Sequence, residues 1–243
     1  MLPGAAARAQ SVRADSLGPA TVMSSLRQHY TRARGAESRL YNGPEYVDYV
    51  KRHINGHQFL GPNELQLATV EYGGAIYERV PLRYDLVKDK LVVQWPMGMV
   101  DLALVNDNVR RFAIGPRHFV RLVAVPLSSP DSAGNGLART GFYELLVDGP
   151  VQMLALRRKE LQERAVAGRL EGSITQKNEF FICKEQRYYK VAKAGAVLAV
   201  FPESKVALRK YVRSEKLKFG EAYREASLLA LMRYHATLAA APN

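Results

Sequence analysis

The chain has 243 residues, of which 47% are hydrophobic and 24% charged, and its formal net charge is +12. This composition allows one large β-rich domain or two small ones. The basic balance permits nucleic acid, anionic lipid or lipopolysaccharide as a partner, but no run of five basic residues marks a dedicated basic tail. No apolar stretch approaches the roughly 18 residues of a membrane-spanning helix. One cysteine, Cys183, excludes an intramolecular disulfide, and its apolar neighbours predict a buried, inert thiol.

Residues 1–19 contain Gly, Ala, Ser and Pro without periodicity, which predicts a disordered tail. An alternative is that the tail is the remnant of a signal peptide. Ala7-Arg8-Ala9 before Gln10 fits the small-x-small pattern of a signal-peptidase site, although the basic and apolar regions of a complete signal are absent. Helical spacing of apolar residues then predicts a helix over residues 20–36.

Residues 38–66 are predicted to form an aromatic loop, since turn signals such as Asn55-Gly56 interrupt them. Residues 67–125 then alternate short β-branched and aromatic runs with tight turns, among them Gly73-Gly74 and Lys88-Asp89-Lys90. Strands joined so closely pair antiparallel, because a parallel crossover needs a dozen or more residues. The stretch predicts a β-meander and argues against most nucleotide-binding α/β folds. The expected strands are 67–72, 75–79, 82–87, 90–95, 99–105, 109–114 and 117–125.

A flexible Ser/Gly/Pro loop at 126–138 precedes hairpins over 139–201, with expected strands at 140–146, 151–158, 179–184, 188–192 and 196–201. Residues 159–172 are open to two interpretations, a helix by propensity or a continued strand. Helical periodicity predicts two helices within 203–239. The predicted fold is α+β but mainly β, a single domain over 20–240. It is a long antiparallel meander, either a curved sheet or a partly closed barrel, with an N-terminal and two C-terminal helices packed on it.

Catalytic and cofactor signatures are absent from the sequence: there is no P-loop, HExxH or GxSxG, and no cofactor is predicted. The best metal candidates are His53 and His57 with Asp48. His residues at i and i+4 share a face only on a helix, however, and Asn55-Gly56 breaks one, so two unrelated loop histidines is the favoured interpretation. Asp85 and Asp89 flank a turn, and turn capping explains them more simply than acid–base catalysis does.

Two basic segments are candidate binding surfaces. The segment 184–193 combines aromatic and basic side chains, as a base-stacking surface requires, in Arg187, Tyr188, Tyr189 and Lys190. An edge hairpin kept soluble by its charges is the favoured interpretation. The C-terminal helical region could touch anionic lipid headgroups or present an ordinary solvated face. Its basic residues are Lys205, Arg209, Lys210, Arg213, Lys216 and Lys218.

Several stretches together resemble a group of uncharacterised exported proteins of Bacteroidetes-type bacteria. They are SRLYNGPEYVDY (38–49), GHQFL (56–60), YGGAIYERVPLRYDLVKDKLVV (72–93), RTGFYELLVDGPVQMLALRRK (139–159), LRKYVRSEKLKF (208–219) and REASLLALMRYHATL (224–238). The resemblance spans residues 37–239. It implies export, with a periplasmic or outer-membrane-associated location, and it carries over no activity and no functional residue.

The sequence therefore predicts a non-enzymatic cell-envelope protein that binds an apolar or anionic ligand or serves as an interaction scaffold. A curved sheet covered by helices can enclose a cavity for such a ligand. The expected partners are an envelope protein, a lipid or an anionic glycan. Two alternatives stand beside this one: an enzyme of an unrecognised class that uses the loop 41–60, and a nucleic-acid-binding protein, which is disfavoured.

Overall fold

The computed structural model describes residues 39–95, 100–124, 136–137, 139–166 and 169–240. The chain divides into two units, residues 1–39 and 40–243, and the second contains nearly all of the described residues. The predicted tail 1–19, the predicted helix 20–36 and most of the predicted loop 126–138 lie outside the described residues.

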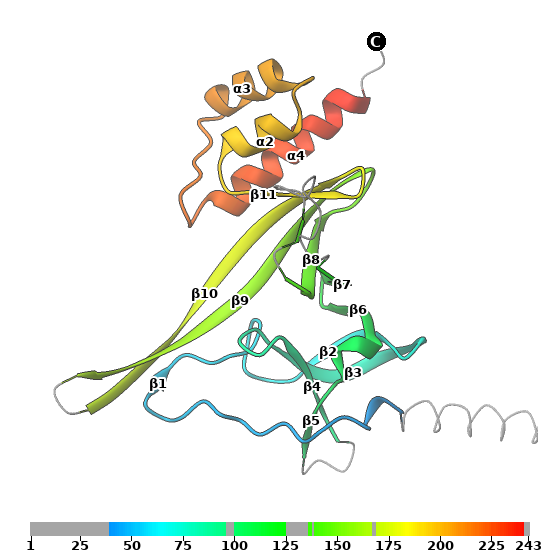
Figure 1. Ribbon diagram of the computed structural model, residues 1–243, viewed down its shortest axis with the longest axis vertical. Coiled ribbons are helices and arrows are strands. Elements are labelled where there is room, and N and C mark those ends of the chain that lie inside the picture. The colour runs from blue at the N-terminus through cyan, green and yellow to red at the C-terminus, as the bar shows by residue number, and fades with distance from the viewer. Residues whose placement is uncertain (1–38, 96–99, 125–135, 138, 167–168, 241–243) are drawn as a thin grey trace, which may run out of the picture. The chain divides into compact units, whose positions relative to one another are not determined.

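The described fold is mainly β, with 46% strand and 21% helix (Figure 1). The strands are β1 (Ile54–Asn55), β2 (Gln66–Tyr72), β3 (Ala75–Asp85), β4 (Lys90–Gln94), β5 (Asp101–Ala103), β6 (Val109–Ile114), β7 (Arg117–Leu122), β8 (Gly141–Val147), β9 (Val151–Val166), β10 (Arg169–Lys184) and β11 (Arg187–Val191). A short 3-10 turn, η1 (Asn106–Asn108), precedes β6, and the helices are α2 (Ala194–Val200), α3 (Lys205–Ser214) and α4 (Arg224–Ala240).

The eleven strands form one sheet in the order β1-β10-β9-β8-β7-β6-β2-β3-β4-β5, and β11 also pairs with β10. All pairs are antiparallel except β1 with β10, so the sheet is mixed. The uninterrupted meander predicted for 67–125 is wrong at one place: β6 pairs with β2 and not with β5. The η1 turn carries the chain across, and the amide of Gly73 donates to the carbonyl of Asn108 (2.8 Å). The separate strands predicted at 75–79 and 82–87 are one strand, β3, with a bulge where Arg79 adopts φ 56°.

The sheet curls around an aromatic cluster. Tyr84 of β3 contacts Phe142 of β8 with ring centroids 5.9 Å apart, although β2, β6 and β7 separate the two strands within the sheet. Phe112 and Phe119 stack between them at 4.6 Å. The strand ladder is nevertheless not closed, so the strands form an open, curled sheet. Single hydrogen bonds bridge the gap, for example from the amide of Lys159 to the carbonyl of Leu86 (3.1 Å).

Strands β9 and β10 form a long antiparallel pair, residues 151–166 with residues 169–184, over all 16 residues of each strand. For the described residues of 159–172, therefore, the continued strand is right and the helix is wrong. The helix propensity of the charged residues in this segment is worth only tenths of a kcal/mol per residue, and an unbroken ladder outweighs it. Cross-strand ion pairs such as Lys177–Glu160 (2.6 Å) add to the pairing.

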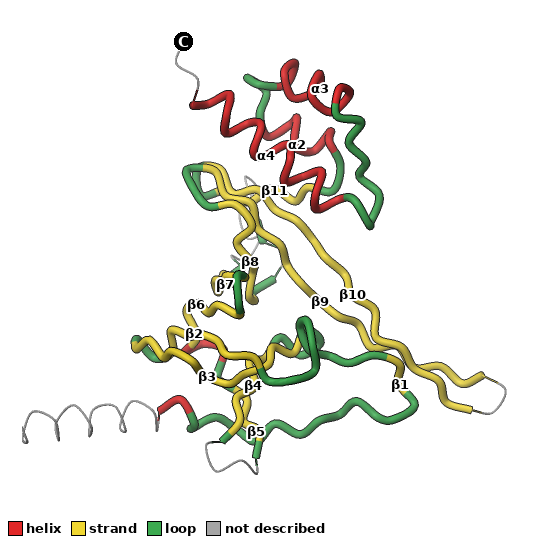
Figure 2. Tube along the Cα trace, turned by 180° about the vertical axis from the view of Figure 1, so that it is seen from behind, coloured by secondary structure: helices red, strands yellow, loops and turns green. Residues whose placement is uncertain are grey.

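The three helices pack on β9, β10 and β11 through one apolar cluster (Figure 2). The two predicted C-terminal helices are confirmed as α3 and α4. The strand predicted at 196–201 is wrong, since these residues belong to helix α2 and its C-cap. Val197, Leu198 and Phe201 follow helical spacing and are all buried, but a short apolar run cannot be assigned by periodicity alone. None of the described helices is long and apolar enough to cross a membrane.

Candidate functional site

The loop that sequence reasoning singled out does not bring its candidate residues together. Asp48 accepts hydrogen bonds from the amide of Val50 (2.9 Å) and the side chain of Gln58 (3.1 Å). His53 lies 3.0 Å from Glu163, whereas the Nδ1 atom of His57 accepts from a backbone amide. Within the described part of the chain, no group of three or more His, Cys, Asp or Glu side chains is placed to hold a metal ion. The three candidates thus make separate contacts and share no cleft.

Asp85 is the centre of a buried polar cluster beneath this loop. Its Oδ1 accepts from the amides of Val87 (2.8 Å) and Lys88 (2.9 Å), which confirms the predicted turn capping. Its carboxylate also accepts from the hydroxyls of Tyr46 (2.7 Å) and Tyr49 (3.0 Å). Burial raises the pKa of both tyrosines, and the Asp85 charge raises it further, so the hydroxyls remain donors. The cluster ties the loop to the end of β3.

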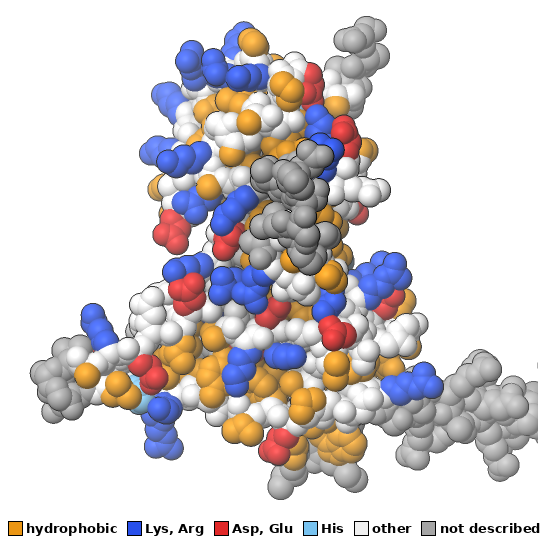
Figure 3. All heavy atoms as spheres, viewed as in Figure 1, with side chains coloured by type: hydrophobic (Ala, Val, Ile, Leu, Met, Phe, Trp, Pro, Cys, Tyr) orange, Lys and Arg blue, Asp and Glu red, His pale blue; other side chains and the backbone are white. Residues whose placement is uncertain are grey.

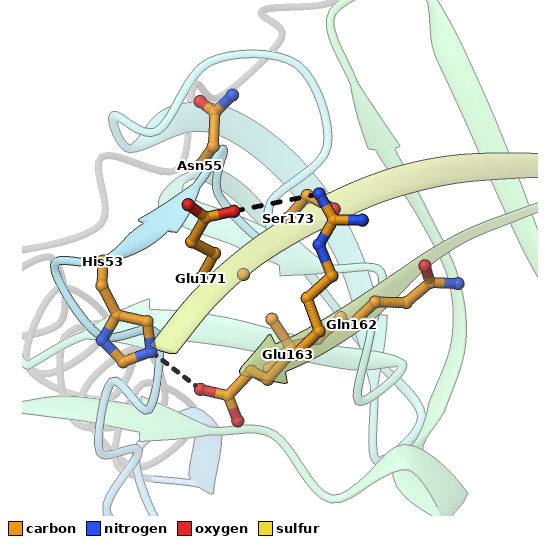
Figure 4. Close-up of a pocket in the computed structure, with 9 residues that line it drawn as sticks. His53, Asn55, Gln162, Glu163, Glu171 and Ser173 are labelled. Carbon is orange, nitrogen blue, oxygen red and sulfur yellow. Dashed lines mark hydrogen bonds and ion pairs between the residues drawn. The ribbon is translucent and has the colours of Figure 1, made fainter. Parts of the chain in front are cut away.

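A polar hollow of about 870 Å³ lies where β1 meets the β9–β10 hairpin (Figure 4). In Figure 4 His53 points across the opening toward Glu163. Glu171, on the same opening, forms an ion pair with Arg164. The distance from His53 to Glu163 is 3.0 Å, and that from Arg164 to Glu171 is 3.8 Å. Lys51 also lies 3.9 Å from Glu163. The charged side chains around the hollow therefore pair with one another, and the pairs of His53 and Lys51 with Glu163 connect the β1 segment to the hairpin.

Gly172 allows β1 to approach the hairpin, and its replacement by alanine tests this. A Cβ at 172 would lie 2.9 Å from Cγ1 of Ile54 and 3.3 Å from the carbonyl oxygen of Gln162. We expect Gly172→Ala to lower the free energy of unfolding by about 1–3 kcal/mol through overpacking. It should also expose the residues of β1 to proteolysis. Gly195→Ala is the control, since nothing lies within 4 Å of a Cβ there. Equal stability of the two variants would contradict the assignment.

The second group of candidates lies on β11 and is engaged within the fold. Tyr188 shares a hydrogen bond with Cys183, and Tyr189 packs against the apolar cluster of the helices. Lys190 lies 2.5 Å from Glu179, and Arg187 is exposed. This arrangement offers no pair of open aromatic faces on which bases could stack. Cys183 is half-buried, and burial raises the pKa of its thiol.

Sequence reasoning missed a chain of charges, buried at its centre, that links the sheet to α4. The Glu144 carboxylate accepts from Arg117 (2.6 and 2.7 Å) and from Arg157 (2.6 Å). Arg157, only 4% exposed, also donates two hydrogen bonds to Glu225 of α4 (2.6 and 2.7 Å). Burial alone would raise the pKa of Glu144, but the two guanidinium groups outweigh it and lower that pKa. Each of these four charges is paired, so their role is structural. No short sequence motif predicts this pairing.

A further group of charged side chains lies on the outer face of α3. Four basic residues and one valine line a shallow hollow of about 280 Å³, and all five are exposed. They are Lys205, Val206, Arg209, Lys210 and Arg213. The opposite face of the helix carries Leu208, which is fully buried. None of the four cations forms an ion pair with another described residue, although α3 itself is firmly docked.

The wider surroundings of α3 are also basic. Residues 184–243 contain twelve Lys and Arg against five Asp and Glu, a net charge of +7 within a chain whose total is +12. Figure 3 shows Lys and Arg side chains gathered over the helices. A concentration of one sign of charge raises the local concentration of oppositely charged ligands and speeds their association.

The fold and this surface define a mainly β protein that carries a basic helical face. Comparison of the chain with known protein families, with curated proteins and with solved structures found no match.

Proposed function

We propose that this protein is a non-catalytic binding protein that holds an anionic partner on the outer face of α3. The observation that carries the proposal is the set of four exposed cations of α3, which have no ion-pair partner among the described residues. Basic side chains in structural roles are paired elsewhere in this fold, as Arg117 and Arg157 are. Exposed cations arranged on one face of a fixed helix suit a multivalent anionic surface.

The geometry favours an anionic partner over an apolar one. Aromatic side chains occupy the interior of the curled sheet, where the ring centroid of Tyr84 lies within 6 Å of those of Phe112, Phe119 and Phe142. The enzyme alternative would need Asp48, His53 and His57 in one cleft, and they make separate contacts. The nucleic-acid alternative on β11 lacks open stacking faces, because Tyr188 and Tyr189 are engaged within the fold.

An exported, envelope-associated location is part of the same proposal. Its support is the resemblance of residues 37–239 to exported proteins, together with a basic surface that suits the anionic components of a cell envelope. Fractionation of the native host, with an antibody to this chain, tests it. We expect the protein in the periplasmic or membrane fraction, and recovery with cytoplasmic markers would contradict the location.

The binding function is tested by neutralising two cations of α3. We expect Arg209→Gln with Lys210→Gln to weaken the affinity for inorganic polyphosphate at 50 mM salt on the order of tenfold or more, because each basic contact with a dense anionic surface is worth about 1 kcal/mol. Binding should weaken steeply between 50 and 500 mM salt.

The matched control is Arg52→Gln with Arg187→Gln, which removes the same charge from two other exposed sites without an ion pair. This control should retain most of the affinity. Equal losses in both double variants would show a general effect of net charge and would overturn the function proposed for α3.

A further inference from the structure

We infer that the anionic partner of α3 is the surface of a lipid bilayer that contains anionic phospholipids. This inference rests on the proposed function and identifies the partner of the same face. Its basis is the combination of four cations with an exposed valine on one arc of a helix.

The five side chains form one continuous stripe. Positions 205, 206, 209, 210 and 213 are spaced i, i+1, i+4, i+5 and i+8, which at 3.6 residues per turn places them within an arc of about 140°. Val206 lies inside this arc, with basic residues on both sides of it. Its side chain is 84% exposed, the most exposed large hydrophobic residue in the described part of the chain.

A bilayer satisfies both kinds of side chain. Headgroup phosphates pair with the cations, whose long aliphatic stems let the charged ends reach the interface while the helix lies flat. The boundary between headgroups and acyl chains accommodates the valine, which water would otherwise surround. A soluble polyanion such as polyphosphate would occupy the cations and leave Val206 in water. The valine therefore distinguishes a lipid headgroup from free phosphate as the source of the anionic groups.

The helix is prepared for this contact before it meets a membrane. Leu208 is fully buried, and the partly buried Tyr211 stacks on Tyr234 of α4 with ring centroids 4.1 Å apart. Because α3 is already folded and held by its inner face, binding does not require the ordering of a segment. Four charges and a single apolar side chain make a weak, reversible and salt-sensitive peripheral attachment.

Flotation of the full chain with vesicles tests the inference. We expect binding to vesicles of phosphatidylcholine with 30% phosphatidylglycerol at 50 mM salt, and little binding to phosphatidylcholine alone or at 500 mM salt. Arg209→Gln with Lys210→Gln should weaken the binding to anionic vesicles about 25-fold, at roughly fivefold for each cation. The Arg52→Gln with Arg187→Gln control should stay near the original chain.

Val206 provides the test that separates a bilayer from a soluble polyanion. Val206→Ser should weaken vesicle binding about threefold to tenfold through the loss of buried apolar area, and should leave polyphosphate affinity unchanged. In a chain that also carries Trp95→Phe, V206W should shift its fluorescence to shorter wavelength on adding anionic vesicles. Circular dichroism of each variant confirms that α3 and the other helices remain folded.

The outcomes distinguish the bilayer from the binding function. Polyphosphate binding that depends on Arg209 and Lys210, without vesicle binding, would overturn the bilayer and leave the function standing. The bilayer would likewise be overturned if Val206→Ser has no effect on vesicle affinity, or if a single-stranded oligonucleotide binds more tightly than the vesicles. Loss of all binding in both double variants alike would overturn the function itself.

Discussion

Replacing Glu144 by glutamine is expected to lower the free energy of unfolding by about 3 kcal/mol at pH 7. Glu144 pairs with Arg117 and with Arg157, and removing one partner of a buried ion pair costs about 3–5 kcal/mol because a charge is left without compensation. We place the effect at the lower end because Glu225 continues to pair with Arg157. Chemical denaturation of the original and variant chains measures the difference.

The control for this prediction is Glu203→Gln. Glu203 pairs with Lys184 at 3.0 Å, but its side chain is 53% exposed, so solvent screens the interaction. Removal of its charge should change the free energy of unfolding by less than about 1 kcal/mol. If both variants lose equally little, the buried chain of charges does not stabilise the junction between the sheet and α4.

The effect of Glu144 has a defined dependence on pH. The folded state lowers the pKa of this carboxyl below its usual value of 4.5. The ionised form therefore contributes stability that is fully present above pH 4.5 and is lost as the pH falls through the lowered folded-state value. The difference between the original chain and Glu144→Gln should stay constant from pH 7 to about 5 and shrink below about 4.5. A difference that grows on acidification would contradict this mechanism.

Replacing Asp85 by alanine is expected to cost about 3–5 kcal/mol of unfolding free energy, since it removes the acceptor of four hydrogen bonds. The donors are the amides of Val87 and Lys88 and the hydroxyls of Tyr46 and Tyr49. The Asp85 side chain is fully buried, so water cannot replace it without rearrangement. We also expect faster hydrogen exchange throughout the loop 41–60, because the two tyrosines anchor that loop to β3.

Two further variants define the origin of this loss. Asp85→Asn keeps the Oδ1 acceptor for the turn amides and should cost less than alanine, with the remaining cost falling on the tyrosine contacts. Asp107→Ala is the control, because its side chain is 80% exposed in another turn. A loss after Asp85→Ala no larger than that after Asp107→Ala would show that the cluster does not hold the loop.

The charge clusters show which parts of a site can be predicted from the sequence. The basic stripe of α3 was visible, since i, i+4 and i+8 spacing within one helix is a local property. The capping role of Asp85 was visible for the same reason. Its two tyrosine donors, 39 and 36 residues away, were not. The pairing of Glu144 with Arg117 and Arg157 was equally hidden, because β7, β8 and β9 must first assemble into a sheet.

The β fold shows the same division. Turn signals at Gly73-Gly74 and Lys88–Lys90 located the hairpins, since turn chemistry depends on adjacent residues. The helix at 194–200 and the strand at 159–166 depend instead on contacts with distant segments of the chain. Residues 194–200 form an apolar run that suits either a helix or a strand, and packing in the apolar cluster of the helices favours the helix. Residues 159–166 are mostly polar and have helix propensity, but pairing with the 16-residue strand β10 outweighs that propensity.

The sequence alone determined the mainly β composition, most strand and turn positions, the last two helices and the basic stripe on α3. Each depends on residues within a few positions of one another, where periodicity, turn chemistry and charge act directly. Only the tertiary structure decided the pairing of β6 with β2, the curl of the sheet around its aromatic rings and the separation of Asp48, His53 and His57. These depend on contacts between distant segments, whose free energy is realised only when the whole sheet is formed.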